Sequence, residues 1–134
     1  MVIRLVALDI YGTVLATDDH NSSFPPRRGL ECFFDVCDVR GIKVVTSSDC
    51  YTANVMAELA HCFGKYPDRR MSLQRFAGFF QLDEVPVKDF SRIIAKSQGI
   101  VGSLILPSEL LVIGDSDKDI DGALKHGCCS VRCP

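Results

Sequence analysis

Residues 110–123 of this chain read LLVIGDSDKDIDGA in one-letter code. The first four residues are apolar, which is typical of a strand that is buried on both faces of a parallel sheet. Four aspartates follow within seven residues, directly after the predicted strand: Asp115, Asp117, Asp119 and Asp121. Carboxylates gathered at a strand end indicate a cation site, and Mg²⁺ combines a few carboxylates with water and phosphate. The alternative is a helix N-terminus rich in aspartate, because carboxylates offset the helix dipole.

A second carboxylate follows the first apolar run of the chain. Residues 2–8 are mostly apolar and rich in β-branched side chains, so they predict another buried strand. Asp9 comes next, and a carboxylate at the end of a buried strand is costly to desolvate unless it has partners. In the turn that follows, Gly12 permits a tight bend and Thr13 can hydrogen-bond to the loop backbone.

Predicted strands and helices alternate along the chain. The expected helices cover residues 27–40, 49–64, 91–98 and 117–126, and the further expected strands cover 42–46, 79–82, 110–113 and 130–132. This order predicts an α/β fold: a three-layer α/β/α sandwich around a central parallel sheet, formed by a single domain over residues 1–134. Residues 65–78 show no clear pattern. The loop 14–26 is too short to form a folded cap, so no sizeable cap is expected.

Composition excludes several classes of partner. The formal net charge is −2, without the basic excess that nucleic-acid binding needs, and the pairs at 27–28 and 69–70 are interpreted as solvated turns. No apolar run approaches the roughly 20 residues of a membrane span, and the first ten residues lack the pattern of a signal peptide. The seven cysteines form an odd set without paired C-x-x-C spacing, so we expect a reducing cytoplasm.

Ligands of open parallel sheets bind beyond the carboxyl ends of the strands, so the chemistry is expected where the predicted strands end. Four elements occur there in order: Asp9 to Thr13, the run Thr46-Ser47-Ser48, Lys88, and the Gly-Asp-x-x-x-Asp run that begins at Gly114. Together they resemble the haloacid dehalogenase superfamily, whose first motif is an Asp-x-Asp-x-Thr type loop. The resemblance covers nearly the whole chain and implies the Rossmann-like core of that superfamily, in a form without a cap.

The resemblance assigns a role to each of these residues. Asp9 would attack phosphorus and form a phospho-aspartyl intermediate that water then hydrolyses, so the expected substrate is a phosphorylated compound. Mg²⁺ would bind the carboxylates of Asp9 and Asp115 and the backbone carbonyl of Tyr11. Asp119 would orient the metal-bound waters or Lys88, and Lys88 would offset the negative charge of the site. The implied activity is that of a Mg²⁺-dependent phosphoric monoester hydrolase.

The hydroxyl that binds the transferring phosphoryl group has two candidates. Thr46 follows an apolar strand in the expected way and is slightly preferred, whereas Ser48 is nearer the usual position when counted from Gly41. Either hydroxyl could instead cap the next helix.

Tyr11 departs from the motif of the phosphatases in this superfamily, which carry a second aspartate there as general acid and base. A phenol can donate a proton but is a poor base at neutral pH, and loss of acid–base catalysis costs roughly 10²–10⁴ in rate. Phosphatase activity is therefore expected to be slow, or confined to substrates with good leaving groups. The Asp-x-Tyr-Gly-Thr form also occurs in metal-independent haloacid dehalogenases, which makes dehalogenation an alternative. A catalytically weak module that binds a phospho-ligand or protein partner is another. The sequence indicates neither the substrate nor the oligomeric state.

Overall fold

The computed structural model describes residues 2–15, 26–65, 71–82 and 87–133. Five strands form one sheet, and every pairing in it is parallel. The strand order is β3-β2-β1-β4-β5, so the first and fourth strands lie side by side at the centre. The strands are β1 (Leu5–Leu8), β2 (Lys43–Ser48), β3 (Gly78–Gln81), β4 (Leu110–Gly114) and β5 (Cys129–Arg132).

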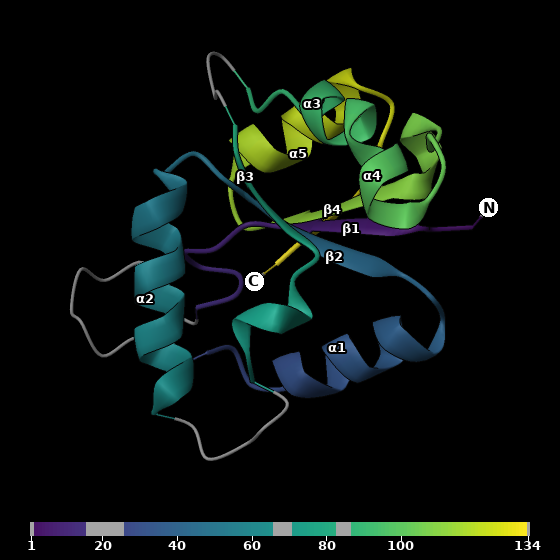
Figure 1. The fold of residues 1–134 in the computed structure, drawn as a ribbon. Helices are drawn as coiled ribbons and strands as arrows, with labels where there is room; N and C mark the ends of the chain where they lie inside the picture. The colour runs from purple at the N-terminus through teal and green to yellow at the C-terminus, as the bar shows by residue number, and fades with distance from the viewer. Residues whose placement is uncertain (1, 16–25, 66–70, 83–86, 134) are drawn as a thin grey trace.

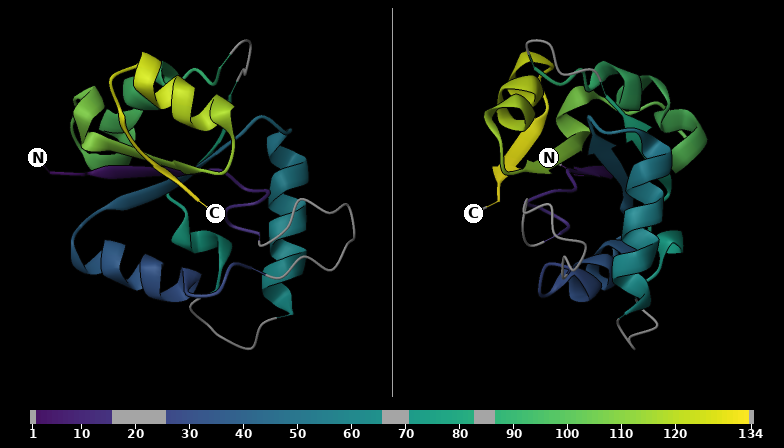
Figure 2. Two further views of the ribbon diagram at one scale, coloured as in Figure 1. Left: turned by 180° about the vertical axis from the view of Figure 1, so that it is seen from behind. Right: turned by 90° about the vertical axis from the view of Figure 1, so that its left-hand side faces the viewer.

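Helices cover both faces of this sheet (Figure 1). One side carries α1 (Leu30–Val39), and the other carries α3 (Ser91–Ala95), α4 (Ser97–Val101) and α5 (Asp117–Lys125). The helix α2 (Thr52–Gly64) stands beside the edge toward which β1 and β2 point, as both views of Figure 2 also show. Two short 3₁₀ helices, η1 (Leu73–Arg75) and η2 (Pro107–Glu109), precede β3 and β4. The predicted α/β sandwich with a central parallel sheet is confirmed.

Two apolar cores lie on the opposite faces of the sheet because side chains alternate along each strand. Val6 and Leu8 belong to the core beneath α1 and α2, whereas Leu5 and Ala7 belong to the core beneath α3, α4 and α5. All four of these residues are buried, which explains why β1 reads as a continuous apolar run rather than an alternating one.

The structure corrects several predicted boundaries. The strand β2 continues to Ser48 rather than ending at Thr46, because its last residues pair with β3. The single helix expected over 91–98 is instead two short helices, with Lys96 between them, and the second is capped at its C-terminus by Gly102, whose φ is +87°. Within 65–78, the described part forms η1 and the start of β3.

Most of the predicted loop over 14–26, together with the basic pair at 69–70, lies outside the described residues. Within the described ranges, every helix is too short or too polar to cross a membrane.

The packing of α5 against the segment after β3 depends on a glycine. A Cβ atom on Gly122 would lie 2.5 Å from the backbone oxygen and 3.1 Å from the backbone nitrogen of Lys88. Gly99 in α4 has no atom within 4 Å of such a position. The two helical glycines therefore make a matched pair.

We predict that Gly122→Ala destabilises the protein by about 1–3 kcal/mol, because the added methyl group meets backbone that cannot easily move. Gly99→Ala should instead stabilise it by about 0.5–1 kcal/mol through helix propensity and a less flexible unfolded chain. Urea unfolding followed by circular dichroism measures both. A gain in stability for Gly122→Ala would contradict the described packing of α5.

Candidate active site

Asp9 lies at the carboxyl end of β1, in the centre of the sheet. Its backbone N–H donates to the carbonyl oxygen of Ile113 at 3.0 Å, which extends the pairing of β1 with β4 by one residue. The residue is 8% exposed. Burial raises the pKa of Asp9 to about 7, with the carboxylates of Asp119 and Asp115 adding to the rise and Lys88 opposing it. Asp9 is thus a desolvated carboxyl group in an excess of negative charge.

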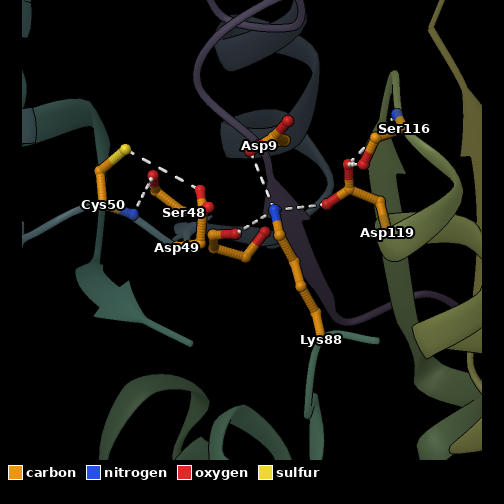
Figure 3. Close-up of polar contacts among 8 residues, drawn as sticks. Asp9, Ser48, Asp49, Cys50, Lys88, Ser116 and Asp119 are labelled. Carbon is orange, nitrogen blue, oxygen red and sulfur yellow. Dashed lines mark hydrogen bonds and ion pairs between the residues drawn. The ribbon is translucent and has the colours of Figure 1, made fainter. Parts of the chain in front are cut away.

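Lys88 provides the cation at the centre of the site (Figure 3). Its ammonium group donates to Asp9 Oδ1 at 3.0 Å and to the backbone oxygen of Ser47 at 2.8 Å, and it lies 2.5 Å from Asp119 Oδ1. Burial alone would lower the pKa of Lys88, but Asp9 and Asp119 together raise it above its ordinary value. The side chain is therefore a buried, protonated ammonium group with three oxygen partners.

Asp119 is fully buried at the start of α5. Its Oδ2 atom accepts hydrogen bonds from the Ser116 hydroxyl at 2.9 Å and from the Ser116 backbone N–H at 3.4 Å. This is a capping box, in which the carboxylate satisfies an N–H group that the helix itself cannot bond. Since Oδ1 binds Lys88, the orientation of Asp119 is fixed at both oxygens.

Asp115 completes an acidic cluster next to the Lys88 ammonium. One carboxylate oxygen each from Asp9, Asp115 and Asp119 lie within 4.8 Å of one another. A Cβ atom on Gly12, whose φ is +80°, would lie 2.0 Å from Asp115 Oδ2, and a Cβ atom on Gly114 would lie 2.3 Å from Asp119 Cγ. The two glycines therefore leave the space that the carboxylates occupy.

The donor set of this cluster fits a small divalent cation. Three carboxylates face one ammonium group, so the site has an excess of negative charge, and carboxylate oxygens are the ligands that Mg²⁺ prefers. Burial is the largest cause of the raised pKa of Asp9, and the carboxylates of Asp119 and Asp115 add to it. Asp9 and Asp115 could hold such a cation, while Asp119 is largely committed to Lys88 and Ser116. The role predicted for the Tyr11 carbonyl stays a prediction.

The Tyr11 side chain points to α2. Its hydroxyl donates to the carboxylate of Glu58, and its ring packs against the core beneath α1 and α2. Burial and the carboxylate of Glu58 raise the pKa of Tyr11 further above its already high ordinary value. The general-acid role predicted for Tyr11 would therefore require this hydrogen bond to break first.

The three hydroxyl residues at the end of β2 are used differently. Thr46 Oγ1 accepts from the Phe80 N–H at 3.3 Å, and Ser48 Oγ accepts from the Cys50 N–H at 3.0 Å, as Figure 3 shows for Ser48. Both hydroxyls keep a proton that could be donated to a phosphoryl oxygen. The Ser47 hydroxyl is buried and has no hydrogen-bond partner among the described residues.

The sequence favours Thr46 and Ser48 but leaves open which of the three hydroxyls, Ser47 included, binds the phosphoryl group. Strand alternation was the available signal: Val45 and Ala7 share one core, so the residues two positions later, Ser47 and Asp9, are expected on the same face of the sheet. The backbone of Ser47 also binds Lys88. All three hydroxyls thus remain candidates for the phosphoryl group.

Arg27 was interpreted as part of a solvated turn, and the structure corrects this. Its Nε atom donates to the Thr13 carbonyl at 2.8 Å and its Nη2 atom to the Gly12 carbonyl at 2.7 Å. The guanidinium group therefore fixes the backbone of the loop that follows Asp9. Nothing in the local pattern around Arg27 signals this contact, because the partners are backbone oxygens about fourteen residues away.

Comparison with known proteins gives a structural likeness without a sequence match. No family model matches this chain, and no curated protein matches it. Among solved structures, it is similar to a Haemophilus somnus protein described as a predicted phosphoglycolate phosphatase (TM-score 0.70, 13% identity, covering 97% of this chain and 84% of that one). It is also similar to a protein from Ehrlichia chaffeensis that is described as a hydrolase of the haloacid dehalogenase superfamily (TM-score 0.70, 14% identity, covering 98% of this chain and 88% of that one).

A third similar structure was solved with bound Mg. The N-terminal part of a Bacteroides fragilis protein, described as containing a phosphatase domain complexed with Mg, has a TM-score of 0.71 at 15% identity. The match covers 99% of this chain and 36% of that one, so this chain spans about a third of it. The agreement lies in the arrangement of the backbone. This chain has the fold of the haloacid dehalogenase superfamily of hydrolases.

Proposed function

We propose that this chain is a Mg²⁺-dependent phosphoric monoester hydrolase with Asp9 as its nucleophile. One observation carries the proposal: a buried carboxylate at the end of the central strand lies against a buried ammonium group and within a cluster of three aspartates. A carboxylate attacks a phosphate dianion poorly unless charge is neutralised around it. The site supplies Lys88 for this purpose, together with a donor set that fits a divalent cation.

The chemistry proceeds in two steps. The Asp9 carboxylate attacks phosphorus and a phospho-aspartyl group forms, while the bond to the leaving oxygen breaks with its electron pair on that oxygen, which takes a proton from water. Water then attacks this group, releases inorganic phosphate and restores the carboxylate. A Mg²⁺ ion held by Asp9 and Asp115 would neutralise charge on the phosphoryl oxygens. Lys88 keeps Asp9 oriented, and a hydroxyl from Thr46, Ser47 or Ser48 donates to the transferring group.

The contacts of the site also bear on the two alternative functions, the dehalogenase and the binding module. A metal-independent dehalogenase also uses an aspartate nucleophile but has no need for the metal-binding carboxylate of Asp115, so the presence of Asp115 beside Asp9 favours the phosphatase. The module that binds a phospho-ligand without turnover is favoured by one contact, the hydrogen bond from Tyr11 to Glu58, because it takes the phenol away from acid–base chemistry. Turnover measurements separate the three functions.

We predict that the protein releases phosphate from p-nitrophenyl phosphate with Mg²⁺ present and loses this activity when EDTA is added. Asp9→Asn should lower kcat by on the order of 10³-fold or more, because the amide cannot act as the nucleophile. Asp121→Asn, which changes an exposed carboxyl group on α5, is the matched control. Halide release from 2-chloropropionate without metal would favour the dehalogenase, and Mg²⁺ binding without turnover would favour the binding module.

A substitution at Tyr11 tests the missing general acid. Tyr11→Asp should raise the rate for alkyl phosphates relative to aryl phosphates by about 10²-fold, since poor leaving groups depend most on proton donation. Tyr11→Phe removes the hydroxyl without supplying an acid, so the alkyl-to-aryl ratio should not change. A lower ratio in Tyr11→Phe would instead identify the tyrosine itself as the proton donor.

The raised pKa of Asp9 predicts a pH dependence of Mg²⁺ binding. The metal binds the ionised carboxylate, so below pH 7 it must displace a proton. Isothermal titration of the wild type with MgCl₂ should give a Kd that rises about tenfold for each pH unit below 7 and levels off above it. A constant Kd between about pH 5.5 and 7 would show that Asp9 is already ionised in the metal-free protein.

A further inference from the structure

The two outer edges of the sheet differ in their hydrogen bonding. At β3, the Gln81 carbonyl points away from β2 and accepts a hydrogen bond from Arg92 Nη1 at 2.8 Å. At the other end of the strand order lies β5, which is at the margin of the molecule in the right-hand view of Figure 2. Within the described residues, β5 pairs only with β4, so its outer edge is open.

Ser130 and Arg132 provide the backbone groups of this open edge. The Cys133 N–H donates to the Gly114 carbonyl at 2.7 Å, so Cys133 and, by alternation, Val131 direct their backbone groups to β4. The N–H and C=O groups of Ser130 and Arg132 therefore point away from β4. Both residues are exposed, and neither has a backbone partner on that side in the described part of the chain. The edge thus offers the donors and acceptors that another strand would bond.

Exposed apolar side chains flank the edge on both faces of the sheet. Val131, 51% exposed, aligns with Ile113 on the face that carries α1. Arg132 lies on the opposite face, where it forms an ion pair with Asp117 of α5. Leu124 follows Asp117 by about two helical turns, so it lies on the same flank of α5, and it is 78% exposed. Water therefore meets both an unpaired strand and apolar side chains here.

We propose that β5 binds β5 of a second copy of this chain in antiparallel orientation, so that two sheets join across a two-fold axis. Such an interface uses the same surface on both copies, and an open strand edge is a surface that can pair with itself. The charge of Arg132 is offset by Asp117 within its own copy. The pairing involves residues 129–133 and none of the residues assigned to catalysis, so it does not depend on the proposed hydrolase activity.

The edge is complementary to itself in one register. In antiparallel pairing, the residues that exchange hydrogen bonds must both point outward, so Ser130 and Arg132 decide the register. A register centred on Ser130 would place Arg132 opposite Cys128, whose N–H already donates to the Ala123 carbonyl at 2.9 Å. A register centred on Arg132 would place like charges directly opposite each other, which is destabilising. Centred on Val131, Ser130 faces Arg132 of the second copy on both sides of the axis, and every outward backbone group is bonded.

This register makes a specific prediction for two cysteines. Cys129 and Cys133 share a face with Val131, because side chains alternate along a strand, and Cys133 lines a cavity together with Ile113. With Val131 on the two-fold axis, Cys129 of each copy faces Cys133 of the other. Such pairs, without mutual backbone hydrogen bonds, have Cα atoms about 4.5 Å apart, and a disulfide requires about 4.4–6.8 Å. The two thiols therefore report on the pairing.

Sedimentation equilibrium of the full chain in a reducing buffer tests the association. The wild type should approach the mass of a dimer between about 1 and 500 µM, as expected for a small interface. Val131→Glu should raise the Kd of the dimer at least about 10-fold, because two carboxylates would face each other on the axis. Val39→Glu is the matched control, since Val39 is 88% exposed on α1, which the pairing does not involve, and this variant should keep the wild-type Kd.

Disulfide trapping tests the register independently. Diamide, which takes up the electrons and protons released by a pair of thiols, should join wild-type chains into a dimer on a non-reducing gel. Cys129→Ser and Cys133→Ser should each abolish the crosslink, since the remaining cysteine then faces serine. An equal mixture of these variants should restore it, because a mixed dimer regains one pair of Cys129 with Cys133. Cys32→Ser, which removes an exposed cysteine of α1, should crosslink like the wild type.

Each outcome supports or overturns the proposed pairing. A wild type that stays monomeric throughout this concentration range overturns it, as does a dimer whose Kd is the same in Val131→Glu as in Val39→Glu. Crosslinking that persists in either single cysteine variant, or that the mixture fails to restore, overturns the antiparallel register and the interface with it. Circular dichroism establishes that each variant is folded, and if Val131→Glu does not fold, the crosslink of the mixture decides.

Discussion

The buried ammonium group of Lys88 is the interaction on which the arrangement of the site depends. It joins the ends of three elements: Asp9 after β1, the Ser47 carbonyl in β2, and Asp119 in α5. Taking such charges out of water is costly, and the cost is recovered only when every partner is in place. Removal of Lys88 would leave the carboxylates of Asp9 and Asp119 in the core without their counter-ion. This dependence ties the sheet edge, the segment after β3 and the start of α5 into one unit.

The close approach of backbone and carboxylates is a second requirement of the same unit. Gly12 and Gly114 lie where a Cβ atom would overlap the side chains of Asp115 and Asp119. Arg27 binds two carbonyls of the loop that contains Gly12 and so holds the loop against Asp115. The carboxylates can approach one another because Gly12 and Gly114 leave the space they occupy and because Arg27 fixes the backbone of the loop.

The sequence predicts those features that follow from periodicity and topology. A parallel sheet brings its strand ends to one edge, so the meeting of Asp9 with Asp115 and Asp119 follows from two apolar runs and the aspartates after them. Features that depend on contacts between distant elements were not predictable. The partner of Tyr11 is Glu58, which lies 47 residues away on a helix with an ordinary apolar stripe. The choice among the hydroxyls of β2 depends on a register that the sequence leaves open by one residue.

The position of Tyr11 has a consequence for how the site could reach a useful rate. The Tyr11 hydroxyl donates to Glu58, so in the described part of the chain this side chain directs no proton donor towards Asp9. In the proposed hydrolase, Lys88 and a cation held by the acidic cluster would then have to lower more of the activation barrier, together with positioning of the substrate. Binding energy from a remote part of a substrate can be used for such positioning.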